Sequence, residues 1–162
     1  MRCSPTRTAT AEPVLYIADT SGIIAAYDES ATEHRPARNL LSAGTAIVSP
    51  LVLDELDHLL VARFGGKQKD RDIADLVIDD LTAIGEEFRY RVPDLGSDDI
   101  RQARTVIDKH KALRLDLADA VNVVLANRYA TDSILTLDRR DFRTVTPLTP
   151  GIGAFRVLPD DL

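Results

Sequence analysis

The sequence is poor in the residues that build cysteine- or histidine-based sites. Its 162 residues include one cysteine, Cys3, so an internal disulfide framework and a Cys-rich zinc site are excluded. The three histidines, His34, His58 and His110, are scattered, which argues against a His-rich metal site. Long apolar runs are also missing: none approaches the ~18 residues of a membrane span, so we expect no transmembrane helix.

Several nucleotide- and ester-processing motifs are absent as well. The chain has no GxxxxGK[ST] phosphate-binding loop and no GxGxxG after its first predicted strand. It has no GxSxG nucleophile elbow. A haloacid-dehalogenase-like phosphatase would carry a second Asp two residues after Asp19, where this chain has Ser21.

The composition is that of an ordinary globular domain, with 44% hydrophobic and 28% charged residues. Lys and Arg number 20 against 26 Asp and Glu, which gives a net charge of −6 and argues against a simple cationic nucleic-acid coat. An acidic protein can still bind nucleic acid where metal ions cancel part of its charge and its basic residues are grouped.

We expect one domain preceded by a tail. Residues 1–13 are polar, and no apolar core follows the early Arg residues, so they form no secretory signal and are predicted to be flexible. The folded domain is predicted to cover 14–162, in a cytoplasmic protein.

Strands and helices are predicted to alternate along this domain. Ser21 and Ser49 are typical helix N-caps, and Pro50 suits a first helical turn. Alternation of this kind predicts an α/β fold with a mostly parallel sheet flanked by helices, whose ligands lie beyond the carboxyl ends of the strands. The predicted strands are 14–18, 45–48, 88–92, 133–137 and 153–157, and the predicted helices are about 21–27, 33–42, 50–64, 68–84, 97–110 and 117–129.

Acidic residues in apolar surroundings carry most of the functional signal. Asp19 and Asp138 each follow an apolar run at a predicted strand end, where a helix cap or turn residue is the plain alternative to a ligand. Asp141, three residues after Asp138, is better explained as a cap.

Three further acids are on predicted helices. Glu55 is at the edge of the apolar stripe of 50–64, whereas Asp54 and Asp57 point away from that stripe and should be solvated. Asp119 is inside the nearly all-apolar helix 117–126, and Asp116 opens that helix as its expected cap.

Carboxylates that converge at one sheet edge would make an oxygen-only site, which suits Mg²⁺ or Mn²⁺ and phosphoryl chemistry. From Lys109 to Arg143 the chain carries seven Lys or Arg and five acids, three of them Asp116, Asp119 and Asp138. If a metal ion binds those three acids, the segment is basic and can hold a polyanion.

Four stretches, in order and spacing, resemble PIN-domain ribonucleases, most closely the VapC toxins of toxin–antitoxin pairs. The resemblance covers about residues 14–158 and implies a PIN-like fold. The matching stretches are Ile17-Ala18-Asp19-Thr20-Ser21-Gly22, Ser49-Pro50-Leu51-Val52-Leu53-Asp54-Glu55-Leu56, Leu117-Ala118-Asp119-Ala120 and Ile134-Leu135-Thr136-Leu137-Asp138-Arg139-Arg140-Asp141-Phe142.

The resemblance also implies roles for individual residues. The metal-binding and catalytic acids would be Asp19, Glu55, Asp119 and Asp138. Asp116 would assist them, and Ser21 and Thr136 would orient the site. Asn122 stands where the family often has a small residue, commonly Ser; its amide could hydrogen-bond an acid or water, and no role is assigned to it.

The implied function is a Mg²⁺- or Mn²⁺-dependent endoribonuclease toxin that cuts structured RNA, tRNA or ribosomal RNA, and so inhibits translation. A homodimer and a VapB-type antitoxin are the implied partners. Two alternatives remain open: a protein-binding PIN module without catalysis, and a DNA-cleaving relative. Arg139, Arg140 and Arg143 follow the fourth acid and are predicted to grip RNA phosphates, unless they pair internally and stabilise the fold.

Overall fold

The computed structural model describes residues 14–63, 68–83 and 89–162. The predicted flexible tail 1–13, the helix end at Gly65-Gly66 and the first residue of the predicted strand 88–92 lie outside these residues. In the part of the chain that is described, no helix is both long and apolar enough to cross a bilayer.

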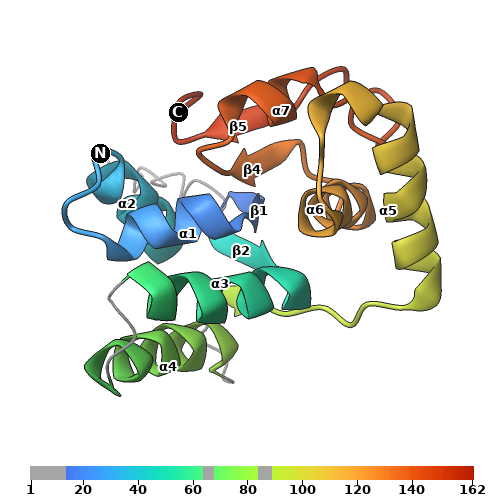
Figure 1. Cartoon of the computed structure of the whole chain (residues 1–162). Helices are drawn as coiled ribbons and strands as arrows, with labels where there is room; N and C mark the ends of the chain where they lie inside the picture. Colours follow the sequence, from blue (N-terminus) through green and yellow to red (C-terminus); the bar gives the residue numbers. More distant parts are fainter. Residues whose placement is uncertain (1–13, 64–67, 84–88) are drawn as a thin grey trace, which may run out of the picture.

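A five-stranded sheet forms the centre of the fold, in the order β3-β2-β1-β4-β5 (Figure 1). All four neighbouring pairs are parallel, which confirms the predicted sheet. The strands are β1 Leu15–Ala18, β2 Thr45–Val48, β3 Tyr90–Arg91, β4 Ser133–Leu135 and β5 Arg156–Leu158.

Helices cover both faces of this sheet, as predicted (Figure 1). The helices are α1 Thr20–Tyr27, α2 His34–Ala43, α3 Pro50–Arg63, α4 Gln68–Thr82, α5 Ser97–Lys109, α6 Leu117–Arg128 and α7 Arg139–Thr144, with a 3₁₀ turn η1 at Lys111–Leu113. Helices α1 to α4 share one apolar cluster, and α5 to α7 share the other.

The alternation of side chains along the strands separates these two clusters. In β1, Tyr16 and Ala18 belong to the cluster beneath α1–α4, whereas Ile17 belongs to the cluster beneath α5–α7. Successive strand residues point to opposite faces, so a strand that is buried on both sides must be apolar throughout. This explains why the strands appear in the sequence as unbroken apolar runs.

The strand order reverses beside β1. From β1 the chain moves to β2 and β3 on one side, and it then returns to β4 on the other side. In parallel sheets such a reversal leaves a crevice beyond the carboxyl ends of the two strands concerned. Asp19 follows β1 and Thr136 follows β4, so both lie at this crevice.

Two helix starts differ in how well the sequence predicted them. Ser49 precedes α3 as expected, and the backbone N–H of Leu51 donates to its Oγ at 3.2 Å. The prediction for Ser21 is wrong: α1 begins at Thr20, and Asp19 stands at its N-cap position. Ser21 lies inside the first turn, where its hydroxyl serves the site described below.

Two features of the C-terminal third also correct the predictions. Asp138, not Asp141, caps α7, because its carboxylate accepts the N–H of Asp141 at 3.3 Å. Asp141 is a buried residue within α7 and pairs with Arg140. The last strand begins at Arg156, three residues after the predicted start, because only 156–158 pairs with β4.

Gly22 allows α1 to approach β4 closely. A Cβ at this position would lie 2.5 Å from the carbonyl oxygen of Leu135, which is backbone and cannot yield cheaply. The close approach brings the first turn of α1, and with it Ser21, against the end of β4.

We therefore expect Gly22→Ala to lower the free energy of unfolding by roughly 1–3 kcal/mol, as overpacked substitutions do. The gain in helix propensity, about 1 kcal/mol, opposes this loss but does not remove the clash. Urea unfolding measures the change. Gly153→Ala is the matched control, because a Cβ there meets nothing within 4 Å; equal stabilities of the two variants would contradict this account of Gly22.

Candidate metal centre and active site

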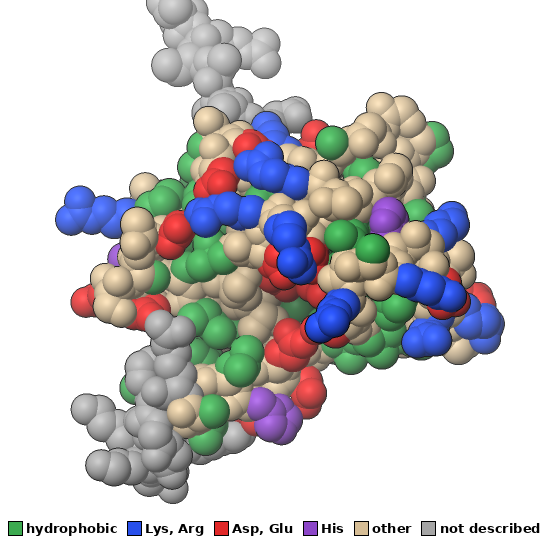
Figure 2. Space-filling view, turned by 45° about the horizontal axis from the view of Figure 1, so that its top comes forward, with side chains coloured by type: hydrophobic (Ala, Val, Ile, Leu, Met, Phe, Trp, Pro, Cys, Tyr) green, Lys and Arg blue, Asp and Glu red, His purple; other side chains and the backbone are tan. Residues whose placement is uncertain are grey.

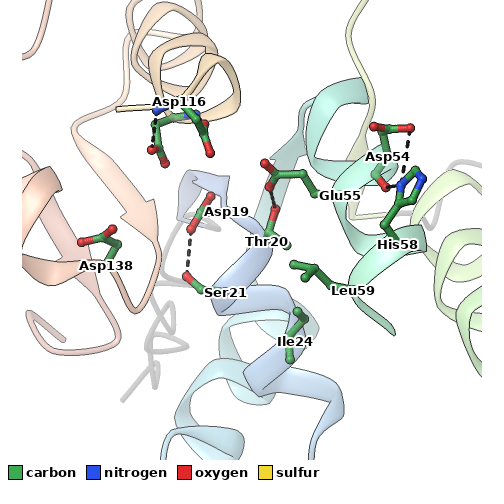
Figure 3. Close-up of a pocket in the computed structure, with 11 residues that line it drawn as sticks. Asp19, Thr20, Ser21, Ile24, Asp54, Glu55, His58, Leu59, Asp116 and Asp138 are labelled. Carbon is green, nitrogen blue, oxygen red and sulfur yellow. Dashed lines mark hydrogen bonds and ion pairs between the residues drawn. The ribbon is translucent and has the colours of Figure 1, made fainter. Parts of the chain in front are cut away.

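The carboxylates singled out in the sequence line one cleft of about 540 Å³. Figure 3 shows them converging from the ends of β1 and β4, from α3 and from the start of α6. The lining residues are Asp19, Thr20, Ser21, Ile24, Asp54, Glu55, His58, Leu59, Asp116, Asp119 and Asp138.

Asp19 is the most deeply buried of these acids, with 6% of its surface exposed. It stands at the N-cap position of α1, but its carboxylate makes no capping hydrogen bond. Its Oδ2 instead accepts hydrogen bonds from the hydroxyls of Ser21 and Thr136, both at 2.8 Å. The carboxylate is therefore held by these two hydroxyls, although the residue stands at the N-cap position.

The backbone at the end of β4 orients the two hydroxyls. The N–H of Leu137 donates to Ser21 Oγ at 2.9 Å, and the N–H of Asp138 donates to Thr136 Oγ1 at 3.0 Å. A hydroxyl has one proton, so each oxygen accepts from the backbone and directs its proton to Asp19. The position of the Asp19 carboxylate is thus fixed by the sheet.

Asn122 holds the other oxygen of Asp19. This residue of α6 is fully buried, and its Nδ2 donates to Asp19 Oδ1 at 3.2 Å. Its own Oδ1 is buried and has no hydrogen-bond partner among the described residues. No role was assigned to Asn122 from the sequence, although an amide inside an apolar helix is a signal of a buried hydrogen bond.

Glu55 enters the cleft from α3, as its place at the edge of the apolar stripe predicted. Its Oε2 accepts a hydrogen bond of 2.6 Å from the hydroxyl of Thr20. Thr20 was missed in the sequence, because a residue next to a strand-end acid has no distinctive spacing of its own. Asp54 lies at the rim of the same cleft with its side chain 75% exposed, as expected for a solvated acid.

Asp116 and Asp119 hold each other through the start of α6. The N–H of Asp119 donates to Asp116 Oδ1 at 2.9 Å, and the N–H of Asp116 donates to Asp119 Oδ2 at 3.2 Å. This reciprocal arrangement is a capping box, and it confirms Asp116 as the helix cap. The remaining oxygens of both residues are available to the cleft.

Asp138 is the most peripheral of the four predicted acids. It is exposed, and its Oδ1 caps α7. It also lines the cleft, on the side of Asp19 opposite Glu55 (Figure 3). Capping uses one oxygen, so the cap and ligand interpretations of this residue are compatible.

Burial and mutual repulsion make the ionised forms of these acids costly. Burial is the main reason that the pKa of Asp19 is raised, and hydrogen bonds from Thr136 and Ser21 oppose the rise. Burial also raises the pKa of Asp119 to about 7, with the charges of Asp116, Asp19 and Asp138 adding to it. The pKa of Glu55 is raised by burial first and by Asp116 and Asp19 next.

A divalent metal ion fits this donor set. The donors are carboxylate oxygens, which Mg²⁺ and Mn²⁺ prefer, and their repulsion is relieved by a cation. Among the described residues no three His, Cys, Asp or Glu side chains form a ready-made ligand group. Mg²⁺ does not require one, because it keeps several waters and binds through one or two carboxylates.

The three arginines after Asp138 make ion pairs within the fold. Arg139 Nη2 lies 2.9 Å from Glu33 Oε1 and 3.0 Å from Asp160 Oδ1. Arg143 Nη2 lies 2.9 Å from Asp161 Oδ1. The exposed guanidinium of Arg140 makes one ion pair within the described ranges, from Nε to Oδ1 of its neighbour Asp141 at 2.8 Å.

Comparison with known proteins places the chain in a family. A family model described as "PIN domain" matches residues 16–146. Ribonuclease VapC26 of Mycobacterium tuberculosis is 38% identical over 145 residues, which are 88% of this chain and 99% of that protein.

Two solved structures have the same fold. The crystal structure of Mycobacterium tuberculosis VapC20, described as a sarcin–ricin-loop-cleaving toxin, matches with a TM-score of 0.63 and 19% identity, over 79% of this chain and 92% of that chain. Rickettsia felis VapBC2, bound to a DNA fragment from its promoter, matches with a TM-score of 0.60 and 16% identity, over 89% and 98%.

Proposed function

The chain belongs to the PIN-domain family and resembles its VapC ribonucleases over nearly its whole length, and from that premise we propose that it is a metal-dependent endoribonuclease, the toxin of a toxin–antitoxin pair. The observation that carries this proposal is the convergence of Glu55, Asp116, Asp119 and Asp138 on the cleft that holds Asp19.

The residues of the cleft have different proposed roles. Asp19, held by Ser21, Thr136 and Asn122, would be the fixed ligand of a Mg²⁺ or Mn²⁺ ion. Glu55 and Asp119, which line the same cleft, would supply further carboxylate oxygens. Such an ion supplies an activated water and neutralises charge on a phosphodiester. Asp138 and Asp116 complete the acidic lining, at the rim and at the start of α6.

The proposed substrate is structured RNA, either tRNA or ribosomal RNA, whose cleavage would inhibit translation. A sarcin–ricin-loop-cleaving toxin shares the fold, which supports the class of substrate without naming the RNA. Unpaired loops are the parts of structured RNA that an enzyme cleft can admit most readily.

The proposed partners are a VapB-type antitoxin and a second copy of the chain. A structural neighbour forms a VapBC pair, which supports the first. The cleft has an apolar wall of Ile24 and Leu59, and Leu59 is 48% exposed. We propose that the antitoxin covers this wall and closes the cleft.

Cleavage of RNA and DNA of one sequence, side by side, tests the proposed activity. Purified protein with Mg²⁺ or Mn²⁺ should cut the RNA and leave the DNA intact. Preference for DNA would favour a DNA nuclease with this fold, and cleavage of neither would favour a protein-binding module.

The three arginines differ in the ion pairs that they would have to break to contact RNA. Arg140 pairs with Asp141 through Nε, so among the described residues its exposed Nη groups can reach a phosphate while that pair is kept, whereas Arg139 and Arg143 must give up ion pairs made by Nη2. We expect Arg140→Ala to weaken RNA binding, to flatten the salt dependence by a slope of roughly 0.7, and to lower the Tm only slightly, through loss of the pair with Asp141.

Arg139→Ala is the comparison, because it removes the link between Glu33 and Asp160. It should lower the Tm by a few degrees with a smaller effect on the salt slope. Titration of a labelled RNA at several salt concentrations, with a melting curve for each variant, checks both. Equal salt slopes for Arg140→Ala and the parent would contradict the assignment of Arg140.

A further inference from the structure

The turn that joins α5 to α6 carries a group of exposed cations. Lys109 ends α5, Lys111 begins η1, and Arg114 ends that 3₁₀ turn with a left-handed backbone, at φ 53° and ψ 34°. Arg114 is two residues before Asp116, so their Cα atoms are at most ~7 Å apart. The turn therefore continues into the acidic lining of the cleft.

These cations are weakly engaged within the fold. Lys109 and Arg114 form no ion pair with any residue in the described ranges, and Lys111 meets only Asp108, at 3.9 Å between two exposed side chains. Exposed pairs of this kind contribute little energy. Arg139 and Arg143 differ from these cations, because their guanidinium groups bind the carboxylates of Asp160 and Asp161.

A second cavity adjoins this turn. It has a volume of about 410 Å³ and is lined by Val106, Lys109, His110, Thr146, Pro147 and Leu148. Its walls are mostly apolar, and its polar groups are an ammonium, an imidazole and a hydroxyl. An apolar wall beside an imidazole can take the flat face of an unstacked base, while neighbouring cations hold the phosphates.

The acids next to the turn leave its positive charges little opposed. On the face seen in Figure 2, Lys and Arg side chains surround a central group of acidic side chains. Two acids border the turn: Asp108 is exposed, and Asp116 belongs to the cleft, where a metal ion would offset its charge. The turn itself then presents three positive charges with little opposition.

We infer that the turn Lys109–Arg114 and its adjoining cavity form a second RNA-binding site, which holds the phosphates of the strand next to the cut and one unstacked base. This inference rests on the proposed endoribonuclease function. It assigns RNA contacts to residues outside the carboxylate cleft. The cations of the turn would bind phosphates, and the adjoining cavity would bind a base.

Binding measurements in an uncleaving background test the inference. Lys111→Gln with Arg114→Gln, made in the Asp19→Asn protein, should weaken binding of a single-stranded RNA oligonucleotide roughly 10- to 30-fold at ~0.1 M salt and reduce the salt slope by ~1.4. Glutamine removes both positive charges, keeps a polar side chain and, like arginine, carries a Cβ at the left-handed backbone position 114. The matched control, Arg35→Gln with Arg91→Gln, removes two charges from exposed positions on α2 and β3 and should have little effect.

The cavity is tested separately with a phosphate oligomer of equal length that lacks bases. His110→Ala should weaken binding of the RNA and leave binding of the abasic oligomer unchanged. An equal loss for both oligomers would overturn the base contact. The phosphate contact would be overturned by a salt slope that stays at the parent value after Lys111→Gln with Arg114→Gln. It would also be overturned by a change of oligomeric state in that variant, because the turn would then be a subunit contact.

Failure of the inference is distinguishable from failure of the proposed function. If the turn variants bind RNA as the parent does while the protein with Asp19 intact still cleaves it, the inference alone falls. If neither binding nor cleavage of RNA is found for the parent, both fall.

Discussion

Asp19→Asn is expected to reduce RNA cleavage by roughly 100-fold or more while leaving the protein folded. Even residues behind metal ligands typically cost about 10- to 100-fold when they are changed, and Asp19 is proposed as the central ligand. An amide at this position is a poor metal ligand and carries no charge to hold the cation.

The fold should tolerate this change because the hydrogen bonds can be kept. The new amide oxygen can accept from Ser21 and Thr136 as the carboxylate does. The new amide nitrogen would face the side chain of Asn122, whose Oδ1 has no partner among the described residues. If the Asn122 amide rotates by 180°, its Oδ1 takes the place of Nδ2 and accepts a hydrogen bond from the new amide. The Tm of the variant without metal should therefore equal or exceed that of the parent.

Expression in cells gives the corresponding biological result. The parent should arrest growth, and Asp19→Asn should not. Asp54→Asn is the control, because this exposed acid at the rim of the cleft has no proposed metal role and should leave toxicity intact. If Asp19→Asn is as toxic as the parent, catalysis at this cleft is not the activity, and the protein-binding alternative gains.

Mg²⁺ or Mn²⁺ is expected to raise the Tm of the parent, and Asp119→Asn is expected to lose most of that gain. A ligand present at ~100 times its Kd stabilises the native state by about 2.7 kcal/mol, which corresponds to roughly 5–10 °C for a chain of this size. Thermal melts with and without metal measure the shift. Asp54→Asn should keep the full shift; an equal shift in parent and Asp119→Asn would mean that the ion binds elsewhere.

The same melts without metal test a predicted direction of the pH dependence of stability. The pKa of Asp119 is raised to about 7 in the fold, above its ordinary value, so the protonated form is favoured by folding. The metal-free parent should therefore lose stability as the pH rises from the ordinary pKa of an Asp, about 4, to about 7. At pH 8 without metal, Asp119→Asn should melt higher than the parent, and this advantage should shrink at pH 5.

Much of this site could be predicted because its residues are conspicuous in sequence. Asp19 ends an apolar strand, and Asp119 interrupts an apolar helix; both positions are costly for a carboxylate without a function. The sheet was predictable for the same reason, since strands buried on both faces are continuous apolar runs. Glu55 could be identified only from the 3.6-residue helical period, which places its side chain beside the apolar stripe and that of Asp54 away from it.

The residues that support these acids were harder to predict. Thr20 and Asn122 act through contacts between distant segments, and their spacing in the sequence carries no trace of those contacts. The cap of α7 was assigned to Asp141 because turn residues resemble one another locally, and only the path of the chain shows that Asp138 does the capping. The ion pairs of Arg139 with Glu33 and Asp160 were likewise beyond local reasoning.

The chemistry of the cut ends tests the central claim most directly. Purified protein, incubated with a structured RNA and Mg²⁺ or Mn²⁺, should produce fragments with a 5′-phosphate and a 3′-hydroxyl, because the bound ion would activate a water for attack on the phosphodiester and the 3′-oxygen would leave. Chelation of the metal should stop the reaction. Fragments that end in a 2′,3′-cyclic phosphate, formed in the presence of the chelator, would show that the RNA 2′-hydroxyl is the nucleophile and would contradict the carboxylate–metal account.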